Sequence, residues 1–132
     1  TNGNFSPIQP VDCILCDSCP FKHLDFILWD RFIFCILAYY RALKISSSET
    51  LSHLIQNFMP DYIYYLDIPV NSAIKRLKNR GPVKPLENAE FLSKVQKEYK
   101  KICKKYPIYI LDALQDPQYL TDAIFSQIKR SR

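Results

Sequence analysis

Hydrophobic and polar positions follow two periods along the chain, and these periods predict its strands and helices. Short apolar runs bounded by charged residues or prolines are typical of buried strands, and they lie at 26–29, 62–68 and 108–111. Apolar residues that recur every three or four positions predict amphipathic helices, and this spacing covers 31–43, 48–58, 70–80, 88–105 and 117–129. Strands that alternate with helices predict an α/β domain with a parallel sheet flanked by helices.

Two of the predicted strands carry more information than the third. Residues 62–68 are rich in aromatic and β-branched side chains, which predicts a strand buried on both faces. The run 26–29 leads directly into Asp30 and Arg31. Because open α/β sheets bind ligands at the carboxyl ends of their strands, these two side chains are candidates for a binding site. The alternative is that they only cap the strand and pair with each other.

The N-terminal segment combines a weak strand signal with a cluster of cysteines. Residues 11–16 predict a short strand, which we expect to join the sheet. Thiolates and an imidazole at short spacing can hold zinc or an iron–sulfur centre, and the candidates are Cys13, Cys16, Cys19 and His23. No second Cys pair follows at zinc-ribbon spacing, so we expect no metal and reduced thiols instead. Five cysteines and no secretory signal favour a reducing compartment, the cytoplasm.

The basic balance of the chain favours anionic ligands. The formal net charge is +5, which suits phosphate-bearing molecules. The lysines between positions 94 and 105 lie on the polar side of the apolar stripe in helix 88–105, and we interpret them as a solvated helix face. We therefore do not expect nucleic acid as a partner. No run of roughly 18 apolar residues occurs, so the sequence predicts no membrane span.

Glycine content restricts the phosphate chemistry that the chain can perform. Gly3 and Gly81 are the only glycines. A phosphate-cradling loop needs glycines, because successive backbone N–H groups must point at the phosphate. Neither Gly-x-x-x-x-Gly-Lys-Ser/Thr nor Gly-x-Gly-x-x-Gly occurs, so this sequence contains no P-loop. The chain also starts without Met, which we interpret as the mark of a fragment or a processed form.

Five segments, in their order and spacing, resemble the thymidylate kinase family. Asp30-Arg31-Phe32 with Ala38-Tyr39 is similar to the family's Asp-Arg-Tyr…Ala-Tyr-Gln segment. The other four are Pro60-Asp61 with Tyr65-Leu66-Asp67-Ile68-Pro69, then Ala73 with Arg76-Leu77 and Arg80-Gly81, then Glu90-Phe91-Leu92 with Val95 and Tyr99, and Tyr106-Pro107 with Ile110-Leu111-Asp112-Ala113. The resemblance covers residues 26–130, and residues 1–25 match nothing in the family.

The resemblance implies a truncated P-loop nucleoside-monophosphate-kinase fold as one domain, residues 1–132. It also implies phosphoryl transfer from ATP to dTMP, with Mg²⁺ as the cofactor that accompanies ATP, and a homodimer as one candidate assembly. By this resemblance the substrate-binding residues are Asp30, Arg31, Phe32, Tyr39 and Tyr40. The catalytic candidates are Arg31, Arg80 and Lys84, and the residues on the ATP and lid side are Arg76, Arg80 and Ala113.

Several departures from the family pattern bear on activity. Tyr40 stands where the family has a thymine-contacting Gln, and Pro85 stands where a lid Arg is expected. Because phosphoryl transfer depends mainly on electrostatic stabilisation by such cations and Mg²⁺, we expect a nucleotide-binding domain that does not catalyse the reaction alone. The alternatives are a catalytically inactive relative, or a basic module that binds nucleic acid or protein and has a Cys-rich N-terminal segment.

Overall fold

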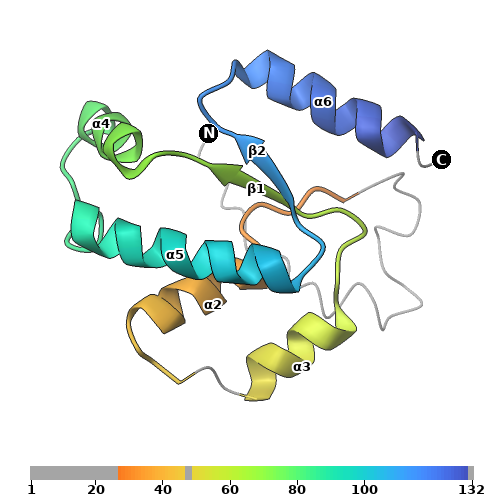
Figure 1. The fold of residues 1–132 in the computed structure, drawn as a ribbon, viewed down its shortest axis with the longest axis horizontal. Coiled ribbons are helices and arrows are strands. Elements are labelled where there is room, and N and C mark those ends of the chain that lie inside the picture. Colours follow the sequence, from red (N-terminus) through yellow and green to blue (C-terminus); the bar gives the residue numbers. More distant parts are fainter. Residues whose placement is uncertain (1–26, 47–48, 131–132) are drawn as a thin grey trace, which may run out of the picture. The chain divides into compact units, whose positions relative to one another are not determined.

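The computed structural model describes residues 27–46 and 49–130 (Figure 1). Residues 31–130 belong to one compact unit, and residues 27–30 fall outside it. The described part contains five helices and two strands, in the order α2 (Ile33–Ala42), α3 (Glu49–Asn57), β1 (Tyr64–Asp67), α4 (Val70–Arg80), α5 (Ala89–Lys105), β2 (Tyr109–Asp112) and α6 (Pro117–Arg130). These elements confirm the predicted helices and the second and third predicted strands, with ends that differ by a few residues.

The two strands pair in parallel along their whole length. Tyr64 lies opposite Tyr109 and Asp67 lies opposite Asp112, so both strands end at the same edge of the sheet. The prediction that residues 62–68 are buried on both faces is wrong, because the side chain of Leu66 is 50% exposed. A strand is covered on both faces only inside a wider, layered sheet, and the described residues supply β1 with a single neighbouring strand.

The predicted first strand is also wrong for the residues that can be compared. Residues 27–29 form no strand, and Leu28 is 90% exposed. A parallel strand exists only where a neighbour accepts and donates its backbone hydrogen bonds, and no described segment pairs with 27–29. Phe26 and the predicted strand 11–16 lie outside the described residues, so the second of these stays a prediction.

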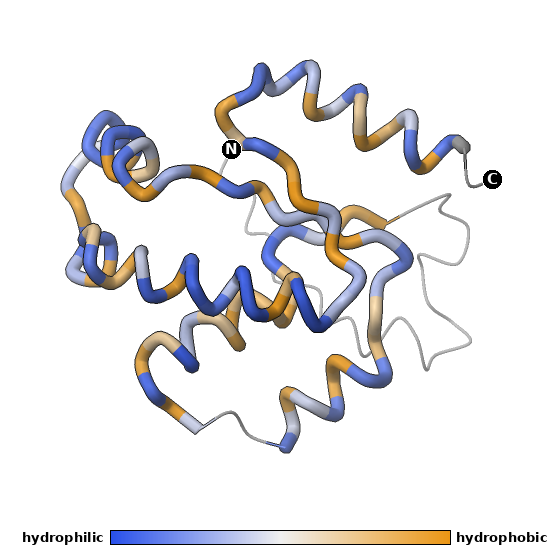
Figure 2. Tube along the Cα trace, in the orientation of Figure 1, coloured by the Kyte–Doolittle hydropathy of each residue, from blue (hydrophilic) through white to orange (hydrophobic). Residues whose placement is uncertain are grey.

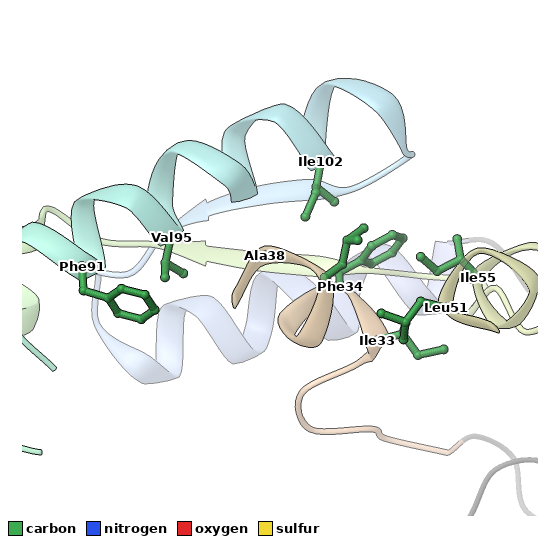
Figure 3. Close-up of a cluster of buried hydrophobic side chains, with 9 residues drawn as sticks. Ile33, Phe34, Ala38, Leu51, Ile55, Phe91, Val95 and Ile102 are labelled. Atoms are coloured by element: carbon green, nitrogen blue, oxygen red, sulfur yellow. The ribbon is translucent and has the colours of Figure 1, made fainter. Parts of the chain in front are cut away.

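The hydrophobic core forms where α2 packs against α5, with a contribution from α3 (Figure 3). Ala38 and Ile102 are 0% exposed, and Figure 3 shows Val95 and Ile102 pointing from α5 toward α2. The small side chain of Ala38 lets the two helices approach closely, and larger apolar side chains fill the space around it. The buried residues are Ile33, Phe34, Leu37, Ala38, Leu51, Ile55, Phe91, Val95 and Ile102.

The opposite side of α5 is solvated, as the sequence predicts. Its lysines at 94, 97, 100, 101, 104 and 105 are all exposed. Figure 2 shows the resulting alternation of hydrophilic and hydrophobic residues along this helix. Within the described ranges, no helix is both long and apolar enough to cross a bilayer.

Candidate functional site

The carboxyl edge of the sheet presents one aspartate from each strand, and both are held by local hydrogen bonds. Asp67 Oδ1 accepts a hydrogen bond from Gln96 Nε2 at 2.9 Å and one from the Tyr65 hydroxyl at 3.2 Å. Asp112 Oδ1 accepts one from the backbone N–H of Leu114 at 2.9 Å. These bonds fix α5 and the loop after β2 at the edge where α/β sheets bind ligands.

Burial and this network also set the pKa of Tyr65. Desolvation raises the pKa of the Tyr65 hydroxyl well above its usual range, and the negative charge of Asp67 and the hydrogen bond to it add to the shift. The ring of Tyr65 stacks on Tyr99, with 4.7 Å between the ring centroids. Burial likewise raises the pKa of Tyr99, and its hydrogen bond with Cys35 contributes. Both phenols are half-buried and remain neutral, and each makes a hydrogen bond.

Two of the residues that we assigned to the ATP side are brought together by the structure. Arg76 Nη2 donates a hydrogen bond to the backbone oxygen of Ala113 at 2.9 Å. The bond links α4 to the turn that follows β2, across 37 positions of sequence. Arg76 is exposed, so its guanidinium lies at the same edge as Asp112 and adds positive charge there.

The loop between α4 and α5, residues 81–88, is closed by Glu87. Arg80 Nη2 donates to both carboxylate oxygens of Glu87, at 2.8 and 3.0 Å, and the backbone N–H of Lys84 donates to Oε2 at 2.9 Å. The N–H of Lys84, followed by the hydrogen bond from Arg80, lowers the pKa of Glu87. The φ of Gly81 is 144°, in the region that favours glycine, and it lets the chain turn out of α4.

The cap of the next helix completes this loop. The Asn88 side chain accepts a hydrogen bond from the backbone N–H of Phe91 at 2.8 Å, as an N-cap does. Its Nδ2 donates to the backbone oxygen of Pro85 at 2.9 Å. The loop is thus held by contacts among residues close in sequence, and Arg80 is bound within it rather than left as a freely moving lid cation.

Tyr39 of α2 lies beside this loop. Together with Lys84, Pro85, Leu86 and Glu87 it lines a depression of about 490 Å³. Burial raises the pKa of the Tyr39 hydroxyl, and the nearby Cys35 adds to the shift, whereas the positive charge of Arg31 opposes it. Arg31 and the loop thus both lie near Tyr39, and the assignment of this region to an acceptor nucleotide stays a prediction.

The backbone at Arg31 marks the start of α2 as an unusual position. Arg31 has a φ of 62°, which a side chain with a Cβ rarely adopts, and such strain concentrates at binding sites. The first turn of α2 contains no acidic residue, and its N-cap, Phe32, provides no side-chain hydrogen bond. The N–H groups of this turn and the Arg31 guanidinium favour an anion at the same end of the helix.

The structure places the remaining candidates elsewhere. Phe32 is half-buried and packs against the hydrophobic core, with its ring 5.5 Å from that of Phe34. Tyr40 is 37% exposed and does not line the Tyr39 depression, because successive helix residues point about 100° apart. Asp30 falls outside the compact unit, so its role beside the acceptor phosphate stays a prediction.

The candidate metal ligands Cys13, Cys16, Cys19 and His23 lie outside the described residues, so the expectation that they bind no metal stays a prediction. In the part of the chain that the structure covers, no three His, Cys, Asp or Glu side chains gather as a metal site would require. Cys35 and Cys103 are free, half-buried thiols.

Sequence reasoning missed two residues that organise the site. The bond of Gln96 to Asp67 could have been suspected from a polar side chain beside the apolar stripe of α5. The closure of loop 81–88 by Glu87 and Arg80 has no periodic signal, because the two residues meet only once Gly81 has turned the chain.

Taken together, these residues define an α/β domain in which Arg and Lys side chains and the half-buried Tyr39 lie at the loops that connect its helices and strands. Comparison with known proteins gives the particular family. The family model "Thymidylate kinase" matches residues 21–124. The "Probable thymidylate kinase 1" of Saccharolobus solfataricus is 30% identical over 112 residues, covering 83% of this chain and 58% of that protein.

Other relatives give the same result. The thymidylate kinase of Thermosipho africanus is 33% identical over 110 residues, covering 79% of this chain and 53% of its own length. That of Acinetobacter baumannii is 33% identical over 108 residues, covering 76% and 52%. This chain belongs to the thymidylate kinase family, and it spans about half the length of the curated relatives it matches. No solved structure matches it significantly.

Proposed function

We propose that this chain provides the acceptor side of a thymidylate kinase, and that it binds dTMP in the region of Arg31 and Tyr39. In the proposed complete reaction, ATP and dTMP give ADP and dTDP. Transfer requires a P-loop segment, which is absent from this sequence, so we infer that the chain alone binds the acceptor nucleotide but does not phosphorylate it. The observation that carries the proposal is the grouping of Arg31 and Tyr39 with loop 81–88.

Each residue type suits its proposed role. The planar guanidinium of Arg31 matches two phosphate oxygens at once, and the strained backbone holds it at the positive end of α2. The neutral ring of Tyr39 lies beside the proposed sugar, where its bulk excludes a 2′-hydroxyl and favours deoxyribose. Lys84 adds a point charge from the loop, while Arg76, beside Ala113, adds charge on the proposed ATP side.

Mg²⁺ accompanies ATP in the family reaction, and within the described residues no three His, Cys, Asp or Glu side chains gather to hold it as a resident ion. Mg²⁺ is bound through one or two carboxylates together with water and substrate phosphates. Asp67 and Asp112 are the carboxylates at the sheet edge, and a magnesium ion there would need water and substrate phosphates as its further ligands. We therefore assign no step of the proposed reaction to a metal held by these residues.

Isothermal titration calorimetry of the full chain with dTMP tests the proposal. We expect saturable binding that Arg31→Ala weakens by about 10- to 150-fold, the loss that corresponds to a charge-assisted hydrogen bond of about 1.5–3 kcal/mol. Arg41→Ala is the matched control, because Arg41 lies at the other end of α2, and it should bind dTMP as the unchanged chain does.

The same titrations separate the proposal from its alternative. Adding ATP and Mg²⁺ to the dTMP-bound chain should produce no dTDP until a segment that contains a P-loop is also supplied. A chain that is folded by circular dichroism but does not bind dTMP would contradict the acceptor-site proposal, and would favour a relative in which the nucleotide site is no longer functional.

A further inference from the structure

A second region of the molecule gathers positive charge far more densely than the proposed nucleotide site does. The C-terminal end of α2 and the solvated side of α5 form a groove of about 470 Å³, which we call the basic groove. It is lined by Arg41, Ala42 and Lys44 from the end of α2, and by Glu98 and the lysines between 94 and 104 of α5. The apolar stripe of α5 predicts only that its lysines are solvated, whereas the structure brings Arg41 at the end of α2 and Lys44 just after it beside them.

Most of these cations have no acidic partner. Lys94 pairs with Glu90 at 2.7 Å, and Lys101 pairs with Glu98, the one acidic residue of the lining, at 2.6 Å. No carboxylate within the described residues pairs with the other cations of the groove, which are Arg41, Lys44, Lys97, Lys100 and Lys104. Five like charges held together by two packed helices repel one another, and a polyanionic ligand would remove that repulsion.

The arrangement of the charges fits an extended polyanion. On α5, Lys97, Lys101 and Lys104 are separated by three or four positions and so form one stripe along the helix. The lysines from 94 to 104 extend over about 15 Å at the helical rise of about 1.5 Å per residue. This length corresponds to about four intervals between successive phosphates of one duplex strand, hence about five phosphates, which are about 3.4 Å apart along the axis.

The chemistry of the lining narrows the choice of polyanion. Among the described residues, no aromatic side chain lines the groove, although aromatic rings are what stack the bases of single strands. Its described lining also lacks the large apolar side chains that a membrane-surface site inserts among lipids, since Ala42 is the single apolar residue there. We propose that the basic groove binds double-stranded nucleic acid through its phosphates, without reading base sequence. This proposal is independent of dTMP binding, because it involves none of the residues assigned to the nucleotide.

Fluorescence anisotropy with a labelled DNA duplex of about 20 base pairs tests this proposal on the full chain. If the five unpaired cations each neutralise one phosphate, log affinity should fall against log salt with a slope of about −4.5. Raising salt from about 50 to about 200 mM should then weaken binding about 500-fold.

Two triple variants with equal charge change locate the binding surface. Arg41→Gln, Lys97→Gln and Lys104→Gln together remove three groove cations, and the slope should change to about −1.8, so that the same salt step weakens binding only about 12-fold. The control combines Lys75→Gln, Lys78→Gln and Lys129→Gln on α4 and α6, and it should keep the original slope.

Three results would overturn the proposal. The first is an equal loss in both triple variants, which would show a response to net charge alone. The second is an absence of duplex binding at about 50 mM salt. The third is binding to phosphatidylserine vesicles without binding to the duplex, which would assign the groove to membranes. Circular dichroism of each variant confirms that the comparison is made between folded chains.

Discussion

Removing the side chain of Ile102 tests whether the contact between α2 and α5 holds the chain together. Ile102 is 0% exposed and belongs to the cluster that joins the two helices. Ile102→Ala deletes three buried carbons, each worth about 0.8 kcal/mol in transfer free energy. The loss is therefore about 2.4 kcal/mol, before the cavity is counted. With the cavity, substitutions of this kind cost about 2–5 kcal/mol, whereas Ile102→Val should cost about 0.5–1.5 kcal/mol.

Urea denaturation followed by circular dichroism at 222 nm measures these costs. The midpoint should fall for both variants while the denaturant slope stays constant. A domain is stabilised by about 5–15 kcal/mol in total, so Ile102→Ala should remove a large fraction of it. Ile110→Ala is the matched control, because Ile110 is 57% exposed, and its effect should stay within about 0.5 kcal/mol. Equal effects of Ile102→Ala and Ile110→Ala would refute the assignment of the core.

Three further predictions concern the site and its tyrosines. Glu87→Gln should speed amide hydrogen exchange at Lys84. The pKa of Glu87 is lowered from 4.5, so its contribution to stability is complete above pH 4.5 and is lost as the pH falls through the lowered pKa. The Gln variant should show no such pH-dependent loss. Tyr39→Ala, but not Tyr39→Phe, should reduce the preference for dTMP over its ribose analogue, and an unchanged preference in calorimetry would remove Tyr39 from the sugar site. Tyr65 and Tyr99 have raised pKa values, so absorbance at 295 nm should show them ionising only above the ordinary tyrosine pKa of 10. The stability that they provide should be lost as the pH rises through their pKa values in the folded chain. Titration of every tyrosine near pH 10 would contradict their burial.

Helices were the part of the fold that the sequence predicted well, and the reason is local. The bounds of α4, Val70–Arg80, follow from an apolar spacing between Pro69 and Gly81, and α5 begins after its Asn88 cap. Caps, proline and glycine act within one or two turns, so a single sequence contains the whole signal. The same holds for the lysines of α5, whose exposure follows from the apolar stripe opposite them.

Strands were predicted less well, because a strand depends on partners that local sequence does not specify. Residues 27–29 have the composition of a buried strand but form none among the described residues. For β1 the position was right and the burial was wrong, since Leu66 remains half exposed. Both errors come from the same assumption, that a wide sheet surrounds each apolar run.

The candidate site was likewise predicted in part, for the residue types but not for their arrangement in space. Residue types at Arg31, Tyr39 and Arg76 could be assigned from the family resemblance. The structure adds that Tyr39 lies beside loop 81–88 and that Arg76 binds the backbone of Ala113. The position of Tyr40 away from the depression follows from helix geometry, which a motif written as a string of letters does not contain. The basic groove could not be predicted at all, because Arg41 and α5 meet only through the packing of α2 on α5.

The contacts of the chain also bear on whether the proposed acceptor site needs a P-loop segment to be organised. Loop 81–88 is closed by the bonds of Arg80 and the Lys84 N–H to Glu87 and by the bond of Asn88 to the Pro85 backbone, all within nine residues. Tyr39 is held against α5 by the T-shaped contact of its ring with Phe91. None of these bonds needs the sheet to be complete. The sheet edge, by contrast, depends on long-range pairing. Binding of the acceptor nucleotide should therefore tolerate the absence of the P-loop segment, whereas transfer of the phosphoryl group should not.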